Sequence, residues 1–281
     1  MLEKTATEEA LDELALLDPA ADSQSGTSVA QGKASAKRSD RGRHVFACEA
    51  PPSRKYMVVK TCVEWVIAAI LLALTSPLLL FLAGLVKLTS PGPAFYSQTR
   101  LGLGGRPYRI HKLRTMTHNC EAKTGPVWAT PNDSRITPIG KILRDTHLDE
   151  LPQLWNVLRG EMSLIGPRPE RPEIVRRLDA AIPNYRARVL VRPGVTGLAQ
   201  MRLPADSDLD AVHRKVAHDL YYVRELGPML DLRIALSTVF YFAAAAANGV
   251  CRSLVGSYGK TVDEALAAEE ATEESAGQEA A

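Results

Sequence analysis

Apolar residues are most concentrated between Val66 and Val86, where the chain carries no charged side chain. This run is about as long as the ~20 residues that cross the core of a bilayer, so it predicts a helix in a membrane. Ser76 and Pro77 fall in its middle, and a proline there removes a backbone hydrogen bond and clashes with the preceding turn. The pattern predicts a helix broken at Ser76-Pro77, with the hydroxyls of Thr75 and Ser76 bonding to the carbonyls that the proline leaves free.

Basic residues flank the apolar run on both sides. A helix that spans the bilayer would place one basic flank outside the cell, against the positive-inside tendency. A re-entrant helix that enters, bends and leaves on the same face keeps both flanks cytoplasmic. We favour this arrangement for residues 51–87 and keep a simple spanning anchor as the alternative. The flanking bases are Lys37, Arg38, Arg41, Arg43, Arg54, Lys55 and Lys60 before the run, and Lys87, Arg100, Arg106, Arg109, Lys112 and Arg114 after it.

Residues 88–260 mix short helical patterns with many Pro and Gly breaks, which predicts a compact, mainly α-helical domain that carries the chemistry. Phe95–Thr99 and Tyr108–Leu113 alternate weakly around Gly102–Gly105, which predicts a small β-hairpin. A second apolar stretch, Ile234–Ala247, is too short for a secure membrane span. It predicts either a core helix or a helix at the membrane interface.

The two ends of the chain differ from the middle in charge. Residues 1–30 carry seven acids against one base, and residues 261–281 carry seven acids and no base, which leaves +15 for residues 31–260. The middle is therefore suited to anions, and the sign alone does not separate nucleic acid, anionic lipid and phosphorylated metabolites. Residues 1–50 and 261–281 show no sustained apolar period, so we predict a disordered head and an acidic disordered tail.

The cysteines and histidines predict no metal centre of their own. The four cysteines are scattered without C-x-x-C spacing, which indicates a reducing, cytosol-facing compartment, and the histidines share no convincing face.

The most informative segment is Leu148–Leu158. Leu151, Leu154 and Leu158 recur at helical spacing and Pro152 suits a first turn, so Asp149 and Glu150 lie at or just before a helix N-terminus. Acids at such a position commonly only cap a helix. Here the bases Arg135, Lys141, Arg144, Arg159 and Arg168 are close in sequence, and carboxylates, bases and a helix N-terminus are what a magnesium-assisted diphosphate site needs.

The segment Ser163–Glu170 contains Gly-Pro-Arg-Pro, in which Pro167 and Pro169 restrict the backbone on both sides of Arg168. An ordinary rigid turn with an exposed arginine would have the same sequence pattern. A pre-positioned guanidinium also suits bidentate phosphate binding.

Six segments taken together resemble, in order, the bacterial sugar transferase family, the monotopic polyprenyl-phosphate phosphoglycosyl transferases. They cover roughly residues 60–234 and are long enough to be specific. The segments are Lys87-Leu-Thr-Ser-Pro-Gly-Pro-Ala-Phe-Tyr, Lys112-Leu-Arg-Thr-Met, Arg135-Ile-Thr-Pro-Ile-Gly-Lys-Ile-Leu-Arg, Leu148-Asp-Glu-Leu-Pro-Gln-Leu-Trp-Asn-Val, Ser163–Glu170 and Val191-Arg-Pro-Gly-Val-Thr-Gly-Leu-Ala-Gln.

The resemblance implies transfer of a sugar-1-phosphate from a UDP-sugar to undecaprenyl phosphate with Mg²⁺, releasing UMP, as the first membrane step of exopolysaccharide, capsule or glycan assembly. It implies a bacterial inner-membrane protein whose catalytic domain lies on the cytoplasmic face. Asp149 matches the family's nucleophilic aspartate and Glu150 its adjacent glutamate, which would hold the metal or orient the lipid phosphate. Ser76-Pro77 matches the family's helix-break motif. We expect the substrates to be bound by Lys112, Arg114, Arg135, Lys141, Arg144, Arg168 and Pro169.

The chain departs from the family at the start of the membrane helix, where Lys60-Thr61 and Glu64 replace the usual Lys-Arg and Asp. It also has Asp133-Ser134-Arg135 where the family often has Asp-Pro-Arg. Neither departure touches the proposed nucleophile.

Two other classes of protein compete with the enzyme. A membrane-attached scaffold of the same fold would use the basic surface to hold acidic partners, but it has no need for paired carboxylates in a basic site. A nucleic-acid binder would interleave aromatic residues with its bases, which this chain does not do. We therefore expect membrane lipids and the two substrates as partners and no nucleic acid, with a homodimer left open.

Overall fold

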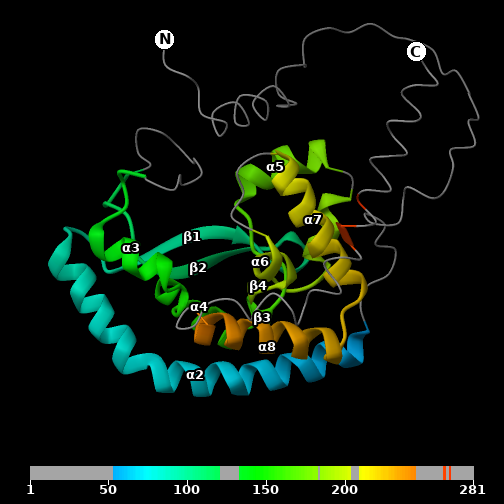
Figure 1. The fold of residues 1–281 in the computed structure, drawn as a ribbon, viewed down its shortest axis with the longest axis horizontal. Helices are drawn as coiled ribbons and strands as arrows, with labels where there is room; N and C mark the ends of the chain where they lie inside the picture. The colour runs from blue at the N-terminus through cyan, green and yellow to red at the C-terminus, as the bar shows by residue number, and fades with distance from the viewer. Residues whose placement is uncertain are drawn as a thin grey trace, which may run out of the picture.

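The computed structural model describes residues 53–120, 133–182, 184–203 and 209–244, together with Val262, Asp263 and Leu266. The predicted head at 1–50 and most of the predicted tail at 261–281 lie outside the described residues. The described chain is mainly helical with two small sheets (Figure 1). Its elements are α2 (Arg54–Thr89), β1 (Phe95–Leu101), β2 (Pro107–Leu113), α3 (Pro138–Asp145), α4 (Gln153–Leu158), β3 (Ser163–Ile165), α5 (Pro172–Ala181), β4 (Gly194–Thr196), α6 (Leu198–Arg202), α7 (Leu209–Arg224) and α8 (Pro228–Ala244), with the 3₁₀ turns η1 (Leu103–Gly105), η2 (Leu148–Glu150) and η3 (Tyr185–Leu190).

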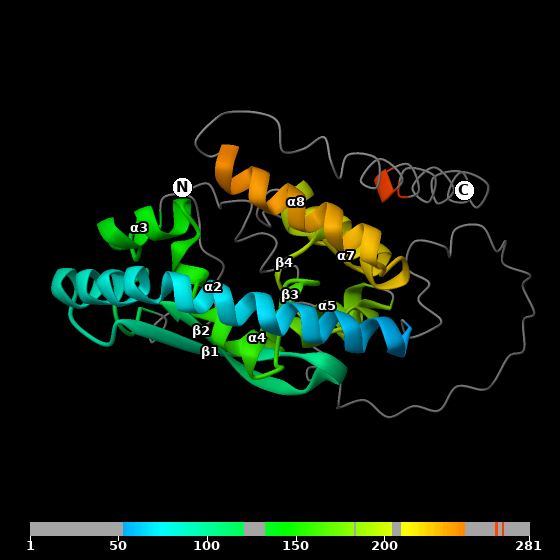
Figure 2. The ribbon, with the colours of Figure 1, turned by 90° about the horizontal axis from the view of Figure 1, so that it is seen from below.

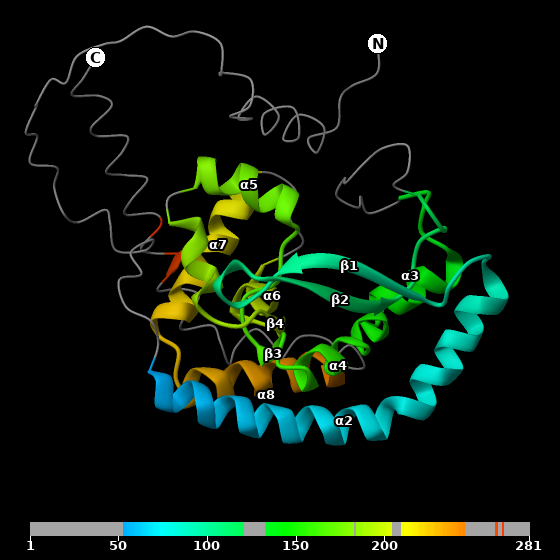
Figure 3. The same cartoon turned by 180° about the vertical axis from the view of Figure 1, so that it is seen from behind.

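The apolar run forms α2, one long helix with Pro77 inside it. The predicted break at Ser76-Pro77 is therefore a bend within a continuous helix, and the bent course of α2 is visible in Figures 1 and 3. The Ser76 hydroxyl donates to the Ala73 carbonyl at 2.9 Å, which is the carbonyl that proline leaves without an N–H donor. The Thr75 hydroxyl donates to the Leu71 carbonyl at 2.7 Å, which is not a carbonyl that the proline frees, so only the Ser76 bond is of the predicted kind.

Both ends of α2 pack against the rest of the molecule. Lys60, Glu64 and Ala68 are buried near its start, and Leu82, Ala83 and Val86 are buried near its end. Between them, Leu74 and Leu80 are 73% and 70% exposed. The helix therefore touches the domain at both ends and leaves its apolar middle uncovered, as its arc along one side of the molecule in Figure 3 also indicates.

The predicted hairpin is confirmed. β1 and β2 pair antiparallel with Tyr96 opposite Lys112 and Leu101 opposite Pro107. Tyr108 and Ile110 of β2 pack on Ala68 of α2 and on α4, which fixes the hairpin against the membrane helix. The second sheet, parallel pairing of β3 with β4, was not predicted, because three-residue strands are too short to show an alternating pattern.

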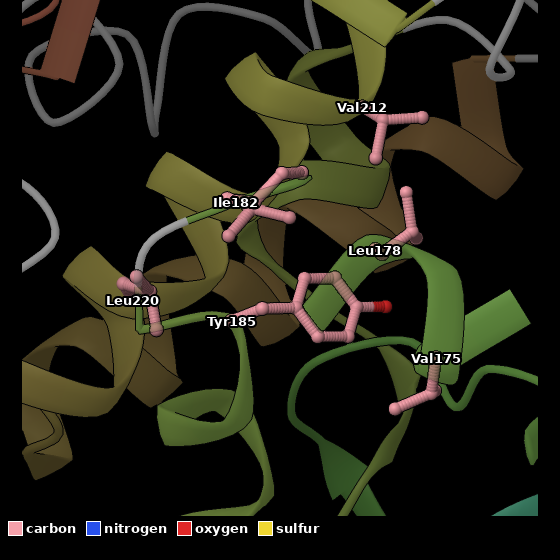
Figure 4. Packing of buried hydrophobic residues seen from close by; sticks show 7 residues of the cluster. Val175, Leu178, Ile182, Tyr185, Val212 and Leu220 are labelled. Carbon is pink, nitrogen blue, oxygen red and sulfur yellow. The ribbon is translucent and has the colours of Figure 1, made fainter. Parts of the chain in front are cut away.

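A hydrophobic core lies between α5, η3 and α7. Figure 4 shows Leu178, Ile182, Tyr185, Val212 and Leu220 converging there. In Figures 1 and 3, α8 lies on the same side of the molecule as α2 and opposite α5, and the view from below shows α2 and α8 together on that face (Figure 2).

The apolar stretch of α8 packs in the core along one face, and its placement at a membrane interface stays a prediction. Ile234 is fully buried, while Leu232, Leu236, Val239 and Phe240 are exposed. One face of α8 therefore belongs to the core, and the other adds to the uncovered apolar surface of α2.

Candidate functional site

The two carboxylates of the informative segment lie on η2, directly before α4. His147 precedes this turn in the left-handed region (φ 55°), and α4 begins at Gln153 with Pro152 as its N-cap. The prediction that Asp149 and Glu150 sit just before a helix N-terminus is thus confirmed.

Glu150 is held by two cations. Its Oε1 accepts hydrogen bonds from Lys112 Nζ at 2.7 Å and from Arg168 Nη2 at 2.8 Å. Burial acts to raise the pKa of Glu150, but Arg168 and Lys112 outweigh it and hold the pKa well below the ordinary range. Glu150 is therefore a fixed anion that joins β2 to the segment after β3.

Asp149 is buried as well, with 7% of its surface exposed, but its carboxylate makes no hydrogen bond within the described part of the chain. Burial raises its pKa, and Lys112, Arg144 and Arg168 offset that rise only in part. The site therefore holds one clamped carboxylate and one that is poorly solvated and unbound. A carboxylate in that state is a better nucleophile than one hydrogen-bonded to water or to a cation.

Lys112 reaches Glu150 because α4 is tied to β2. The side chain of Asn156, which is fully buried, donates to the Arg109 carbonyl at 2.7 Å and accepts from the His111 N–H at 3.1 Å. Burial lowers the pKa of Lys112, and the charge of Glu150 counteracts that shift.

Arg168 is placed by the tight crossing of β3 and β4. A Cβ at Gly166 would lie 2.5 Å from the Arg192 carbonyl, so only glycine fits where the chain turns toward Arg168. From the other side, Arg188 donates to the Arg168 carbonyl at 2.9 Å and pairs with Asp219 at 2.5 Å. Pro169, the other predicted residue of this segment, is buried directly after Arg168.

The remaining predicted cations differ in the partners that they bind. Arg144 acts on the pKa of Asp149 and donates to the Thr115 hydroxyl at 2.9 Å. Arg135 binds Asp133 through several bonds, and Lys141 is 70% exposed with Asp145 as its partner.

The guanidinium of Arg114 is used to hold the connection between α2 and β1. It donates to the carbonyls of Ser90 and Pro91 and to the Ser90 hydroxyl. The structure thus brings Lys112, Arg144, Asp149, Glu150 and Arg168 together. Substrate binding by Arg114, Arg135 and Lys141 stays a prediction.

Sequence reasoning missed the residues that support the site. Asn156 interrupts an otherwise apolar helix face, which is a usable signal for a buried hydrogen-bonding role. Glu170 is held by Lys215 at 2.7 Å with Arg100 at 3.6 Å, and these charges keep its pKa near 2 although burial opposes them. No spacing in the chain links Glu170 with Lys215, so that pair could not be found from the sequence.

The family described as bacterial sugar transferases matches residues 55–245, which includes all described site residues. The chain belongs to the bacterial sugar transferase family. The membership confirms the resemblance drawn from the six segments.

Three relatives illustrate the range of the family. A UDP-glucose:undecaprenyl-phosphate glucose-1-phosphate transferase of Caulobacter vibrioides is 47% identical over 182 residues, covering 64% of this chain and 68% of the relative. A UDP-N-acetylgalactosamine-undecaprenyl-phosphate N-acetylgalactosaminephosphotransferase of Aeromonas hydrophila is 43% identical over 188 residues, covering 67% and 44%. An exopolysaccharide production protein of Rhizobium leguminosarum is 44% identical over 175 residues, covering 60% and 86%.

The chain spans less than half the length of several curated relatives, including the Aeromonas protein. The residues that match the family, 55–245, contain the described unit from α2 to α8 apart from Arg54.

Proposed function

We propose that this protein transfers a sugar-1-phosphate from a UDP-sugar to undecaprenyl phosphate, releasing UMP, through a covalent intermediate on Asp149. The observation that carries the proposal is the buried, unbound carboxylate of Asp149 beside Glu150, which Lys112 and Arg168 hold. Relatives that are 43% and 47% identical to this chain are named for this reaction.

In the first step an Asp149 oxygen attacks the donor's sugar-bearing phosphorus. The bond between that phosphorus and the bridging oxygen breaks, and UMP leaves with the electron pair. In the second step an oxygen of undecaprenyl phosphate attacks the same phosphorus and displaces Asp149, which forms an undecaprenyl diphosphate sugar and restores the carboxylate. The sugar-1-phosphate thus passes between two anionic substrates by two displacements at one phosphorus, in place of one direct transfer.

The bases around Asp149 absorb the charge of the departing nucleotide. Arg168 offers a guanidinium for the diphosphate, and Lys112, which contacts the same Glu150 oxygen, adds a second positive charge. Arg144 lies close enough to lower the pKa of Asp149 and so to support its ionised form.

The carboxylates also fit a magnesium ion. Mg²⁺ is commonly bound by one or two carboxylates together with substrate phosphates and water. Glu150 Oε2 and the Asp149 carboxylate are oxygen donors that the Lys112 and Arg168 contacts leave available. Among the described residues, no group of three or more His, Cys, Asp and Glu side chains could hold a metal, so the ion would need the substrate's phosphates as further ligands. When bound, it would neutralise charge on the leaving phosphate.

We also propose that α2 enters the cytoplasmic membrane and returns to the same face. It is long and apolar enough to cross a bilayer, by length and composition. Its two ends both pack on the catalytic domain, however, and only its middle is uncovered. A spanning helix would carry one end away from the domain. The exposed apolar face of α8 would lie at the same membrane surface.

The test is UMP release by purified protein from a panel of UDP-sugars, with and without undecaprenyl phosphate and Mg²⁺. We expect metal-dependent release with one donor, which stops after about one UMP per protein without undecaprenyl phosphate and continues in its presence. The relatives' names include both glucose and N-acetylgalactosamine donors, so both belong in the panel. No release from any UDP-sugar would favour the membrane-attached scaffold.

A further inference from the structure

A closed set of buried hydrogen bonds joins the start of α2 to β3, α7 and α8, away from Asp149. Its centre is Glu64 of α2. Lys60 Nζ donates to Glu64 at 2.7 Å and to Asp231 of α8 at 2.7 Å. All three side chains are buried, and Lys60 and Glu64 lie on adjacent turns of α2.

The Glu64 carboxylate binds β3 through both of its oxygens. Oε2 accepts from the Ser163 hydroxyl at 2.5 Å, and Oε1 accepts from the Ile165 N–H at 3.2 Å. Ile165 is an edge position of a two-stranded sheet, so this N–H would otherwise be buried without a partner. Glu64 thus accepts a backbone hydrogen bond that a third strand would accept, and it fixes β3 to α2.

The set closes through α7. The Tyr222 hydroxyl lies 3.0 Å from the Ile165 carbonyl and 2.7 Å from Asp231, so it can donate to either. Tyr56 donates to the other Asp231 oxygen at 2.6 Å. Two carboxylates and one ammonium are therefore satisfied in a buried site by hydroxyl and backbone donors. Such a site adds little net stability compared with apolar packing, but it accepts only one relative position of its elements.

The strand that Glu64 holds leads directly into the site. Ile165 is followed by Gly166 and Pro167, which leave the backbone little freedom before Arg168. Displacement of Ile165 would therefore be passed on to the guanidinium that binds Glu150.

We propose that Glu64 is a positioning residue, which sets Arg168 by fixing β3 to the seated membrane helix. This inference rests on the proposed function for its kinetic consequence, but not for its structural one. A shift of about 1 Å in a substrate-binding group remote from the change can cost up to ~100-fold in rate. The contact between Glu64 and β3 would make full activity depend on the position in which α2 packs against the domain.

The kinetic test is a double-mutant cycle with Glu64→Leu and Arg168→Lys, with UMP release as the readout. Glu64→Leu leaves Lys60 paired with Asp231, so no unpaired buried charge is created. We expect Glu64→Leu to lower kcat/KM about 10- to 100-fold. We expect Glu64→Gln, which keeps an acceptor for β3, to lose less. In the Arg168→Lys background the Glu64→Leu loss should shrink to a few-fold, because both changes act on the same contact. Losses that multiply in full would overturn the proposal.

The matched control is Thr61→Val, which removes the 2.8 Å bond between α2 and Arg192 without touching β3. It should retain parental activity. A loss as large as that of Glu64→Leu would mean that any weakening of the α2 contact has the same effect, and the specific role of Glu64 would be wrong.

Amide hydrogen exchange tests the link without activity. Glu64→Leu should speed exchange of the amides at 163–166 and at Arg168, and Thr61→Val should not. Unchanged exchange in Glu64→Leu would overturn the inference. Faster exchange in a protein that releases no UMP from any donor would instead keep the structural link and reject the proposed function.

Discussion

Asp149 and Glu150 are consecutive carboxylates whose pKa values move in opposite directions. Burial acts on both, but Lys112 and Arg168 bind only Glu150 through hydrogen bonds. Two titratable neighbours with opposed shifts are typical of sites that assign separate chemical roles to the same functional group. Here Glu150 binds the two cations, and Asp149, whose carboxylate is not hydrogen-bonded to another described residue, is available to react.

Asp149→Asn should abolish UMP release while leaving the fold intact. Because burial raises the pKa of Asp149, its ionised form opposes folding at neutral pH, and a neutral amide removes that cost. The midpoint of thermal unfolding should therefore equal or exceed that of the parent. UMP release at the parental rate would show that the intermediate is not formed on Asp149.

Glu150→Gln should destabilise the protein at neutral pH by about 2–3 kcal/mol, since it leaves Lys112 and Arg168 without their anion. The lowered pKa of Glu150 means that its contribution is present above the ordinary carboxyl pKa and is lost as pH falls toward the folded value. The difference in unfolding midpoint should thus shrink in acid. The control is Asp145→Asn, whose ion pair with Lys141 is exposed and should contribute almost nothing.

Arg168→Lys should weaken donor binding, because a lysine cannot offer the planar pair of donors that a diphosphate uses. We expect kcat/KM for the UDP-sugar to fall about tenfold or more, which corresponds to ~1.4 kcal/mol of transition-state stabilisation. Arg186→Lys, on an exposed side chain that pairs with Asp179, is the matched control and should be neutral. Equal effects in the two variants would remove Arg168 from the binding site.

The rate of the first step should fall in acid with an apparent pKa above the ordinary aspartate value, because Asp149 must be ionised to attack. The measurement is the burst of UMP without undecaprenyl phosphate, which excludes titration of the lipid phosphate. An acid limb at or below the ordinary aspartate pKa would contradict the environment described for Asp149.

Topology can be tested with single cysteines at Lys55→Cys and Leu88→Cys in a background without the native cysteines. These positions lie at the two ends of α2. Membrane-impermeant labelling should reach both from the cytoplasmic side. Labelling from opposite sides would establish a spanning anchor and exclude the re-entrant helix.

Local signals in the chain were enough for the elements that depend on neighbours in sequence. The uninterrupted apolar run predicted α2, and the serine before its proline predicted the bond to the Ala73 carbonyl. Glycines between alternating segments predicted the hairpin, and leucine spacing with Pro152 placed Asp149 and Glu150 before α4. The break at Pro77 was overestimated because side-chain hydroxyls keep the helix continuous.

The sequence by itself determined which residues could react, because the family's segments and the helix-start pattern both single out Asp149, Glu150 and Arg168. Only the tertiary structure decided which cations meet those carboxylates. Lys112 and Arg168 reach Glu150, whereas Arg114 is used at the end of α2, and no spacing in the chain distinguishes these roles. The same holds for the contact of Glu64 with β3. Long-range pairings depend on how elements pack, and periodicity along a chain describes only what each element presents to its surroundings.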